Sequence, residues 1–152
     1  MFTLSVASHF DAAHRLNGYK GNCQRIHGHR WAVTVQVEGK ELNSWGALID
    51  FKEIKEYVKK FVKERYDHKL VLKQEGKKNA ELKKVLPDEW ICWTLKNPTA
   101  EYLAEEIYNG LFPWFKYRKI KLSKIVVFET PDNGVSYQST AKKRFFRLGR
   151  EL

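Results

Sequence analysis

The chain has 152 residues, of which 43% are hydrophobic and 30% are charged, and its formal net charge is +10. This composition excludes a disordered chain, and the length predicts a single globular domain over residues 1–152. No apolar run approaches the roughly 20 residues that a membrane span needs, and the first residues do not form a secretory signal. We therefore expect a cytoplasmic protein without a membrane partner, with Cys23 and Cys92 both reduced.

The positive charge favours an anionic partner but does not identify it. Lysine and glutamate are spread along the whole chain, so a solvated surface alone explains much of the charge. A basic protein also attracts anions, and both RNA and a small triphosphate are anions of this kind. The charge therefore leaves a nucleic-acid-binding module and an enzyme for a phosphorylated substrate as alternatives.

Two strands are expected in the first part of the chain, because residue types alternate there. In residues 2–14 one parity carries the apolar side chains and ends at His14, and residues 17–21 then form a loop. In residues 27–38 one face carries His27, His29 and Trp31, followed by valines, while the other face is polar. The second segment has the most regular period-two pattern in the chain.

A helix is expected next, from Asp50 as its N-cap to about Arg65, with Glu53 in position to complete a capping box. The lysine-rich stretch 73–84 follows, and its pattern does not decide between a further helix and a mobile insertion.

A second long helix is expected to begin at Thr99 and to be limited by Pro113. Two strands then close the chain, at 125–129 and from Val135 to about Phe146, joined by the turn 131–134. The order β-β-α-α-β-β predicts an α+β fold with a four-stranded antiparallel sheet. The open edges of such a sheet need cover, which further copies of the chain would provide.

Three histidines form a candidate metal site. His27 and His29 lie two residues apart on a strand, so both rings leave the same face, and His14 ends the preceding strand. A hairpin places these strand ends side by side, and three neutral imidazoles suit zinc with a fourth position open. The competing interpretation is a group of unrelated polar residues near a loop. His9 has the opposite parity to His14 and is expected at the surface or in packing.

The residues nearby allow more than one role. Cys23 precedes His27 closely enough to be a buried apolar residue, a fourth zinc ligand, or a nucleophile or base whose thiolate the metal favours. Cys92, between Ile91 and Trp93, is expected to pack in the core. Asp67 could orient His68, although a histidine after a helix is also favoured by the helix dipole.

Two glutamates also need an explanation. Glu101 lies in the first turn of the second helix, where acidic residues usually complement the helix dipole. Glu129 ends an apolar strand on its core-facing parity, so its carboxylate needs hydrogen-bond donors, and a ligand is one source of them.

Together these motifs resemble the 6-pyruvoyl tetrahydropterin synthase family, which includes the 6-carboxytetrahydropterin synthases. The resemblance covers nearly the whole chain, and the matching segments are 10–15, 23–29, 49–51, 67–68, 98–101 and 129–130. The segment Cys23 to His29, with its HGH ending, is the most specific. The short gap between Cys23 and His27 is similar to that in the 6-carboxytetrahydropterin synthases of queuosine and archaeosine biosynthesis.

The resemblance implies the tunnelling fold, with two helices on one face of the sheet, three subunits closing a barrel, and two trimers forming a hexamer. It implies a Zn²⁺ cofactor on His14, His27 and His29. It implies that Cys23 is the proton-abstracting base and that an adjacent subunit supplies its partner residues, Asp67 and His68. It further implies that the pterin ring is held by Glu129, Thr99 and Glu101.

The activity implied is a zinc-dependent carbon–oxygen lyase that eliminates triphosphate from 7,8-dihydroneopterin triphosphate. The product expected is 6-carboxy-5,6,7,8-tetrahydropterin; a 6-pyruvoyl tetrahydropterin or related archaeal-type product is the first alternative. A non-catalytic, zinc-containing module that binds nucleic acid is the second, and the core parity of most aromatic residues argues against it. Two departures from the family pattern leave the exact substrate open: Tyr102 stands where the family usually has Asn, and the stretch 73–96 is longer than the short connection that the resemblance implies, so we regard it as an insertion.

Overall fold

The computed structural model describes residues 1–75 and 77–140, with only the backbone described at 77–80. The strands are β1 Phe2–His14, β2 His27–Gly39, β3 Lys69–Lys73, β4 Ile91–Thr94, β5 Lys121–Thr130 and β6 Asn133–Tyr137. The helices are α1 Phe51–Arg65, α2 Lys77–Val85 and α3 Ala100–Tyr117, with short 3₁₀ turns η1 Asn22–Gln24 and η2 Asp88–Trp90. The fold is therefore α+β, as expected.

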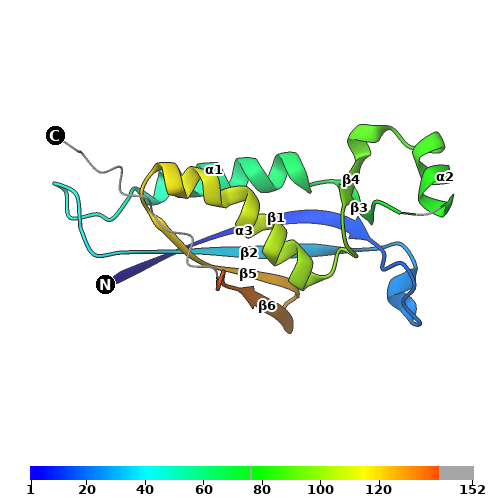
Figure 1. Ribbon diagram of the computed structural model, residues 1–152, viewed down its shortest axis with the longest axis horizontal. Coiled ribbons are helices and arrows are strands. Elements are labelled where there is room, and N and C mark those ends of the chain that lie inside the picture. Colours follow the sequence, from blue (N-terminus) through cyan, green and yellow to red (C-terminus); the bar gives the residue numbers. More distant parts are fainter. Residues whose placement is uncertain (76, 141–152) are drawn as a thin grey trace, which may run out of the picture.

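The strands form one sheet in the order β4-β3-β1-β2-β5-β6. The hairpin of β1 and β2 is its centre and pairs without interruption from Phe2 opposite Gly39 to His14 opposite His27. Helices α1 and α3 lie side by side over one face of this sheet (Figure 1), α1 against β1 and α3 against β5 and β6. This arrangement buries the apolar parity of the central strands, including Phe10, Trp31 and Val33.

The expected four-stranded antiparallel sheet is incomplete, because the structure has six strands in a mixed sheet. Strands β1, β2, β5 and β6 are antiparallel neighbours, as predicted. The two further strands, β3 and β4, pair in parallel with β1 and with each other. They were missed because segments of four and five residues are too short to show a period, and parallel pairing joins segments that are distant in sequence.

The lysine-rich stretch has regular structure. Residues 77–85 form α2, which stands apart from α1 and α3 beside β3 and β4 (Figure 1), and η2 then leads directly into β4. Residues 73–96, expected as an insertion, therefore contain helix α2, the turn η2 and strand β4. Helices commonly connect parallel strands, because the chain must return to the end of the sheet at which the first strand began.

Pro113 does not end the second long helix, which continues to Tyr117. A proline inside a helix removes one main-chain hydrogen bond, but Leu111 and Phe115 on either side are completely buried. Burying these large side chains outweighs that loss. The helix begins as predicted, with the Thr99 hydroxyl accepting a hydrogen bond from the Tyr102 N–H.

The first long helix has the expected boundaries, whereas both closing strands differ: β5 begins at Lys121 rather than Ile125, and β6 begins at Asn133 rather than Val135. Asp50 caps α1 by accepting a hydrogen bond from the Lys52 N–H at 2.8 Å, and α1 ends at Arg65. The last strand ends at Tyr137, not near Phe146; residues 138–140 are not in a strand, and 141–146 lie outside the described residues. None of the described helices is long and apolar enough to cross a membrane.

Candidate metal centre and active site

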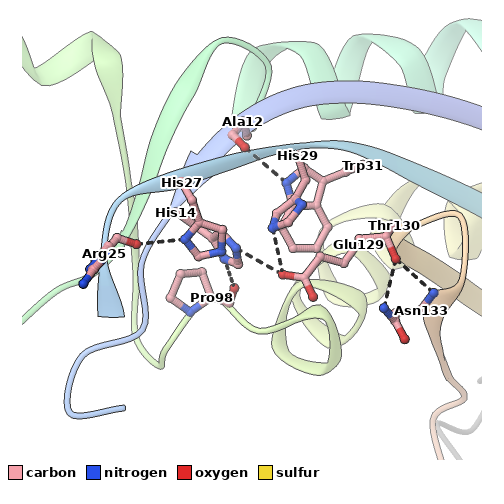
Figure 2. A network of polar contacts seen from close by, with 10 residues as sticks. All are labelled: Ala12, His14, Arg25, His27, His29, Trp31, Pro98, Glu129, Thr130 and Asn133. Atoms are coloured by element: carbon pink, nitrogen blue, oxygen red, sulfur yellow. Dashed lines mark hydrogen bonds and ion pairs between the residues drawn. The ribbon is translucent and has the colours of Figure 1, made fainter. Parts of the chain in front are cut away.

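Four side chains converge where the central hairpin meets the end of β5. Their ligand atoms all lie within 4.8 Å of one another, and they belong to His14, His27, His29 and Glu129. The register explains the histidines: His14 is opposite His27, Ala12 is opposite His29, and alternate residues on a strand share a face. Figure 2 shows the three rings and the carboxylate pointing toward one another.

Main-chain carbonyl groups orient two of the rings. Nδ1 of His14 lies 2.8 Å from the carbonyl oxygen of Pro98, and Nδ1 of His27 lies 2.8 Å from that of Arg25 (Figure 2). A carbonyl oxygen only accepts, so each Nδ1 carries the proton and donates it. The Nε2 atoms then keep their lone pairs, which is the tautomer that a metal requires.

The contact with Glu129 shows why a cation fits here. Its Oε1 lies 3.1 Å from Nε2 of His14 and 3.3 Å from Nε2 of His29. Burial lowers the pKa of both histidines, and the opposing charge of Glu129 offsets this only partly. The Nε2 lone pair of His14 thus faces a carboxylate, and among the described residues the Nε2 atoms of His14 and His29 are both buried without a hydrogen-bond partner. A divalent cation would satisfy all of these acceptors.

Trp31 forms a wall of this cluster that sequence reasoning did not assign to the site. Its ring is completely buried, with centroids 5.1 Å from the His14 ring and 5.5 Å from the His29 ring. Its indole N–H donates to the Ala12 carbonyl at 3.4 Å. The only signal in the sequence is that Trp31 shares the parity of His27 and His29.

Cys23 lies in η1 and is half-buried. Its main-chain carbonyl accepts a hydrogen bond of 2.8 Å from the Leu16 N–H, which closes the loop between β1 and β2. In the described part of the chain, the potential metal-binding group contains Glu129 and not Cys23. Cys92 is buried as expected, and burial raises the pKa of its thiol to about 11. His9 is exposed.

Asp67 and His68 form a pair directly after α1. Nδ1 of His68 lies 3.0 Å from Asp67 Oδ2, while Asp67 Oδ1 accepts the Asp11 N–H at 2.9 Å. Burial alone would raise the pKa of Asp67, but these hydrogen bonds and the charges of His68 and Lys63 lower it. His68 has φ 58, in the left-handed region that a side chain rarely adopts. The result is an ionised carboxylate that orients an exposed imidazole.

A cavity of about 520 Å³ lies beside His68. Asp11 and Arg30 line it, and their parity puts them on the sheet face opposite the rings of His14 and His29. Leu86 and Trp90, at the end of the lysine-rich segment, form another wall. His29 of the metal cluster also lines this cavity, so His68 and one of the predicted metal ligands border the same space within one chain.

A second cavity, of about 410 Å³, contains two of the predicted substrate-binding residues. Thr99 and Glu101 line it together with Tyr102 and Tyr137. Among the described residues, Glu129 is not part of this lining and belongs to the histidine cluster. The structure thus brings the three predicted metal ligands together with Glu129, and places Thr99 and Glu101 along a cavity whose described lining does not include Glu129.

Comparison with known proteins identifies the family of the chain. The profile of the 6-pyruvoyl tetrahydropterin synthases matches residues 3–140. The chain belongs to this family. It is 35% identical to the 6-carboxy-5,6,7,8-tetrahydropterin synthase of Rickettsia bellii, over 81% of this chain and 90% of the relative. It is 33% identical to that of Haemophilus influenzae, over 91% and 99% of the two chains.

Solved structures share the fold of this tetrahydropterin synthase family member. The 6-pyruvoyl tetrahydropterin synthase of Plasmodium vivax aligns with a TM-score of 0.70 at 24% identity, over 91% of this chain and 97% of that one. An uncharacterized protein of Wolinella succinogenes aligns with a TM-score of 0.76 at 19% identity, over 91% and 99%. At these identities the likeness extends to the fold alone.

Proposed function

We propose that this tetrahydropterin synthase family member is a zinc-dependent lyase. It eliminates triphosphate from 7,8-dihydroneopterin triphosphate and yields 6-carboxy-5,6,7,8-tetrahydropterin. The observation that carries the proposal is the cluster of His14, His27 and His29, whose ligand atoms meet those of Glu129 within 4.8 Å. The names of the relatives from Rickettsia bellii and Haemophilus influenzae favour this product.

The donor set is the reason for choosing zinc. Imidazole nitrogens suit this ion, and a catalytic zinc site has three protein ligands with a fourth position for water or substrate. When bound, zinc supplies a Lewis acid that polarises a substrate oxygen and acidifies the adjacent C–H bond. The carbonyl groups of Pro98 and Arg25 would hold His14 and His27 in the orientation that this ion needs.

The protein's own groups would move the protons. Cys23 sits in the loop that joins the two histidine-bearing strands, and as a thiolate it would remove the proton from the substrate carbon. His68, oriented by the ionised Asp67 at 3.0 Å, would relay protons as the triphosphate leaves. The net positive charge of +10 would favour the approach of the anionic substrate.

A complete site in this proposal combines two chains. Among the described residues, Asp67 and His68 are not members of the potential metal-ligand group, and His68 is exposed, which supports supply of this pair to the site of a neighbouring subunit. The sheet of the described chain has two edges, β4 and β6. Pairing at such edges would close a barrel of three chains, and two such trimers would form the proposed hexamer.

The pterin ring would be held by three side chains. Glu129 would accept N–H groups of the ring, helped by Thr99 and Glu101, which line the 410 Å³ cavity.

The test is to incubate zinc-loaded protein with 7,8-dihydroneopterin triphosphate and to identify the products by mass. The proposal expects 6-carboxy-5,6,7,8-tetrahydropterin, triphosphate and acetaldehyde, and no product from a His29→Ala control. A 6-pyruvoyl product without acetaldehyde would establish the alternative synthase activity. Absence of any conversion by the metal-loaded protein would overturn the proposed function.

A further inference from the structure

Asn97 connects two parts of the site that are far apart in sequence. Its side-chain Oδ1 accepts the Asn17 N–H at 2.9 Å, and its Nδ2 donates to the Asn17 carbonyl at 2.9 Å. One amide side chain thus pairs with both main-chain groups of a single residue, as a neighbouring strand would. Asn17 lies in the loop between β1 and β2, after His14 and before Cys23.

The loop continues this connection to Cys23. The N–H of Leu16, next to Asn17, donates to the Cys23 carbonyl at 2.8 Å. Cys23 is therefore fixed to the part of the loop that Asn97 holds. Among the described residues, the loop makes no other side-chain hydrogen bond to the segment before α3, so loss of this amide would release the contact.

The main chain around Asn97 leads to the metal cluster. The carbonyl of the next residue, Pro98, accepts the proton of His14 Nδ1 at 2.8 Å, while the Asn97 carbonyl accepts the Thr99 N–H at 2.8 Å. Pro98 is buried, and the Thr99 side chain caps α3. The segment is thus held between a rigid helix start and the loop, and it determines where the Pro98 carbonyl meets His14.

We propose that Asn97 is a positioning residue that holds His14 and the Cys23 loop in one fixed arrangement. This rests on the proposed roles of His14 as a metal ligand and Cys23 as the base. Asn97 touches neither residue with its side chain and acts through Asn17 on one side and Pro98 on the other. Orientation of ligands by such outer partners commonly changes metal affinity or activity by about 10-fold to 100-fold.

The test uses two substitutions and a matched control. Asn97→Ala removes both bonds to Asn17, whereas Asn97→Asp keeps the acceptor for the Asn17 N–H and loses only the donor. The control is Asn43→Ala, because Asn43 also holds a loop by accepting two main-chain N–H groups at 3.0 Å, from Trp45 and Ala47. That loop follows the end of β2 farthest from the histidines (Figure 1).

The most informative measurement is hydrogen exchange at the Leu16 amide. Neither substitution removes its acceptor, the Cys23 carbonyl, so faster exchange reports release of the loop itself. We expect exchange there to quicken by about tenfold or more in Asn97→Ala, and less in Asn97→Asp. Alkylation of Cys23 by iodoacetamide, followed on its peptide by mass, should quicken in parallel.

The second measurement is the visible absorption of the Co²⁺-substituted protein, which reports ligand geometry. We expect a changed spectrum in both Asn97 variants and an unchanged one in Asn43→Ala. If Asn97→Ala does not fold, Asn97→Asp decides alone. Leu16 exchange and a cobalt spectrum that match the control would overturn the proposal. None of these measurements needs substrate, so they stand apart from failure of the proposed function.

Discussion

Oε1 of Glu129 lies 3.1 Å from Nε2 of His14 and so occupies a corner of the histidine cluster. From the sequence, Glu129 is expected to bind the pterin ring. Both roles use the same carboxylate, but they differ in what its loss would do to the metal. If Glu129 binds only the pterin ring, its loss leaves the three histidine ligands in place. If Glu129 is the fourth ligand of a closed metal site, its loss removes one of the four ligands.

The first prediction separates these roles with Glu129→Gln. The variant should keep about one zinc per chain, as determined by metal analysis, because the histidines are unchanged. Binding of a pterin such as sepiapterin should weaken by about one to two orders of magnitude, as expected for loss of a charge-assisted hydrogen bond. His29→Ala is the control and should lose most of its zinc. Equal loss of zinc in Glu129→Gln would make Glu129 a metal ligand.

The second prediction concerns Cys23→Ala. Cys23 is outside the group of ligand atoms, so the variant should keep its zinc and its melting temperature. Turnover should fall by about 10² or more, the scale for removal of a proton-transfer group. The matched control is Cys92→Ala, which empties a buried core position and should lower the melting temperature instead. A metal-free, destabilised Cys23→Ala would refute the catalytic role.

The third prediction concerns a polar network that anchors the end of α1. Arg65 donates to Glu106 at 2.6 Å and to the Trp93 carbonyl at 3.0 Å, and the buried Tyr66 hydroxyl donates to Glu106 at 3.1 Å. Burial and the charge of Glu106 raise the pKa of Tyr66, so its hydroxyl stays protonated. Glu106→Ala leaves the Tyr66 hydroxyl without its acceptor and leaves Arg65 with only the Trp93 carbonyl.

Glu106→Ala should therefore lower the free energy of unfolding by about 1.5–3 kcal/mol, measured by urea denaturation. Tyr66→Phe should cost less, because the Arg65 contact with Glu106 remains. The control is Glu56→Ala in the exposed pair with Lys52 at 3.9 Å, where the change should stay within about 0.5 kcal/mol. A loss for Glu106→Ala as small as for the control would show that the network contributes little.

The sequence alone predicts the three histidines of this site, but few of the groups that surround them. Strand parity alone places His14, His27 and His29 on one face, because the hairpin brings neighbouring segments together. The partners of those rings come from distant segments: the Pro98 carbonyl is 84 residues from His14. A main-chain carbonyl has no side-chain signature, so no pattern could have indicated it.

The same distinction holds for the fold. The central hairpin and both long helices follow from period and capping residues such as Asp50 and Thr99. Strands β3 and β4 are short and pair in parallel across long connections, so nothing local specifies them. The contact of Glu129 with His14 likewise depends on how β5 pairs with β2, which a single sequence does not determine.

The fourth prediction is a pH dependence from Asp67. The pKa of Asp67 lies below the usual 3.8. Burial alone would raise this pKa, but the hydrogen bonds from Asp11 and His68 lower it by more. A depressed carboxyl pKa stabilises the folded chain above the unfolded pKa, and the contribution disappears as the pH falls through the folded value. Asp67→Asn should therefore unfold more easily than the parent at pH 7, and the difference should shrink below about pH 4.

Thermal unfolding of both proteins between pH 7 and pH 2.5 measures this difference. Asp50→Asn serves as the control, since asparagine is about as good an N-cap as aspartate. A gap between Asp67→Asn and the parent that does not change with pH would show that the Asp67 charge contributes nothing, and that only its shape matters.

The last prediction concerns shared active sites. His68 is exposed and lines a cavity with Asp11, Arg30 and His29, so its imidazole is accessible to a neighbouring chain. If one chain supplies the metal and Cys23 while its neighbour supplies Asp67 and His68, two different defects can compensate. Cys23→Ala and His68→Ala should each be inactive alone. In a mixed oligomer, some sites receive an intact Cys23 from one chain and an intact His68 from the other.

Mixing the two variants should therefore restore part of the activity, at most about one quarter of the parent's for equal and random mixing of two-chain sites. Subunit exchange must be shown first, for example by native mass spectrometry of differently tagged chains. The control mixes Cys23→Ala with Asp67→Ala and then His68→Ala with Asp67→Ala. The first pair should recover activity, and the second should not, because Asp67 and His68 belong to the same half of the site. A monomer at micromolar concentration, or no recovery after proven exchange, would refute a site built from two chains.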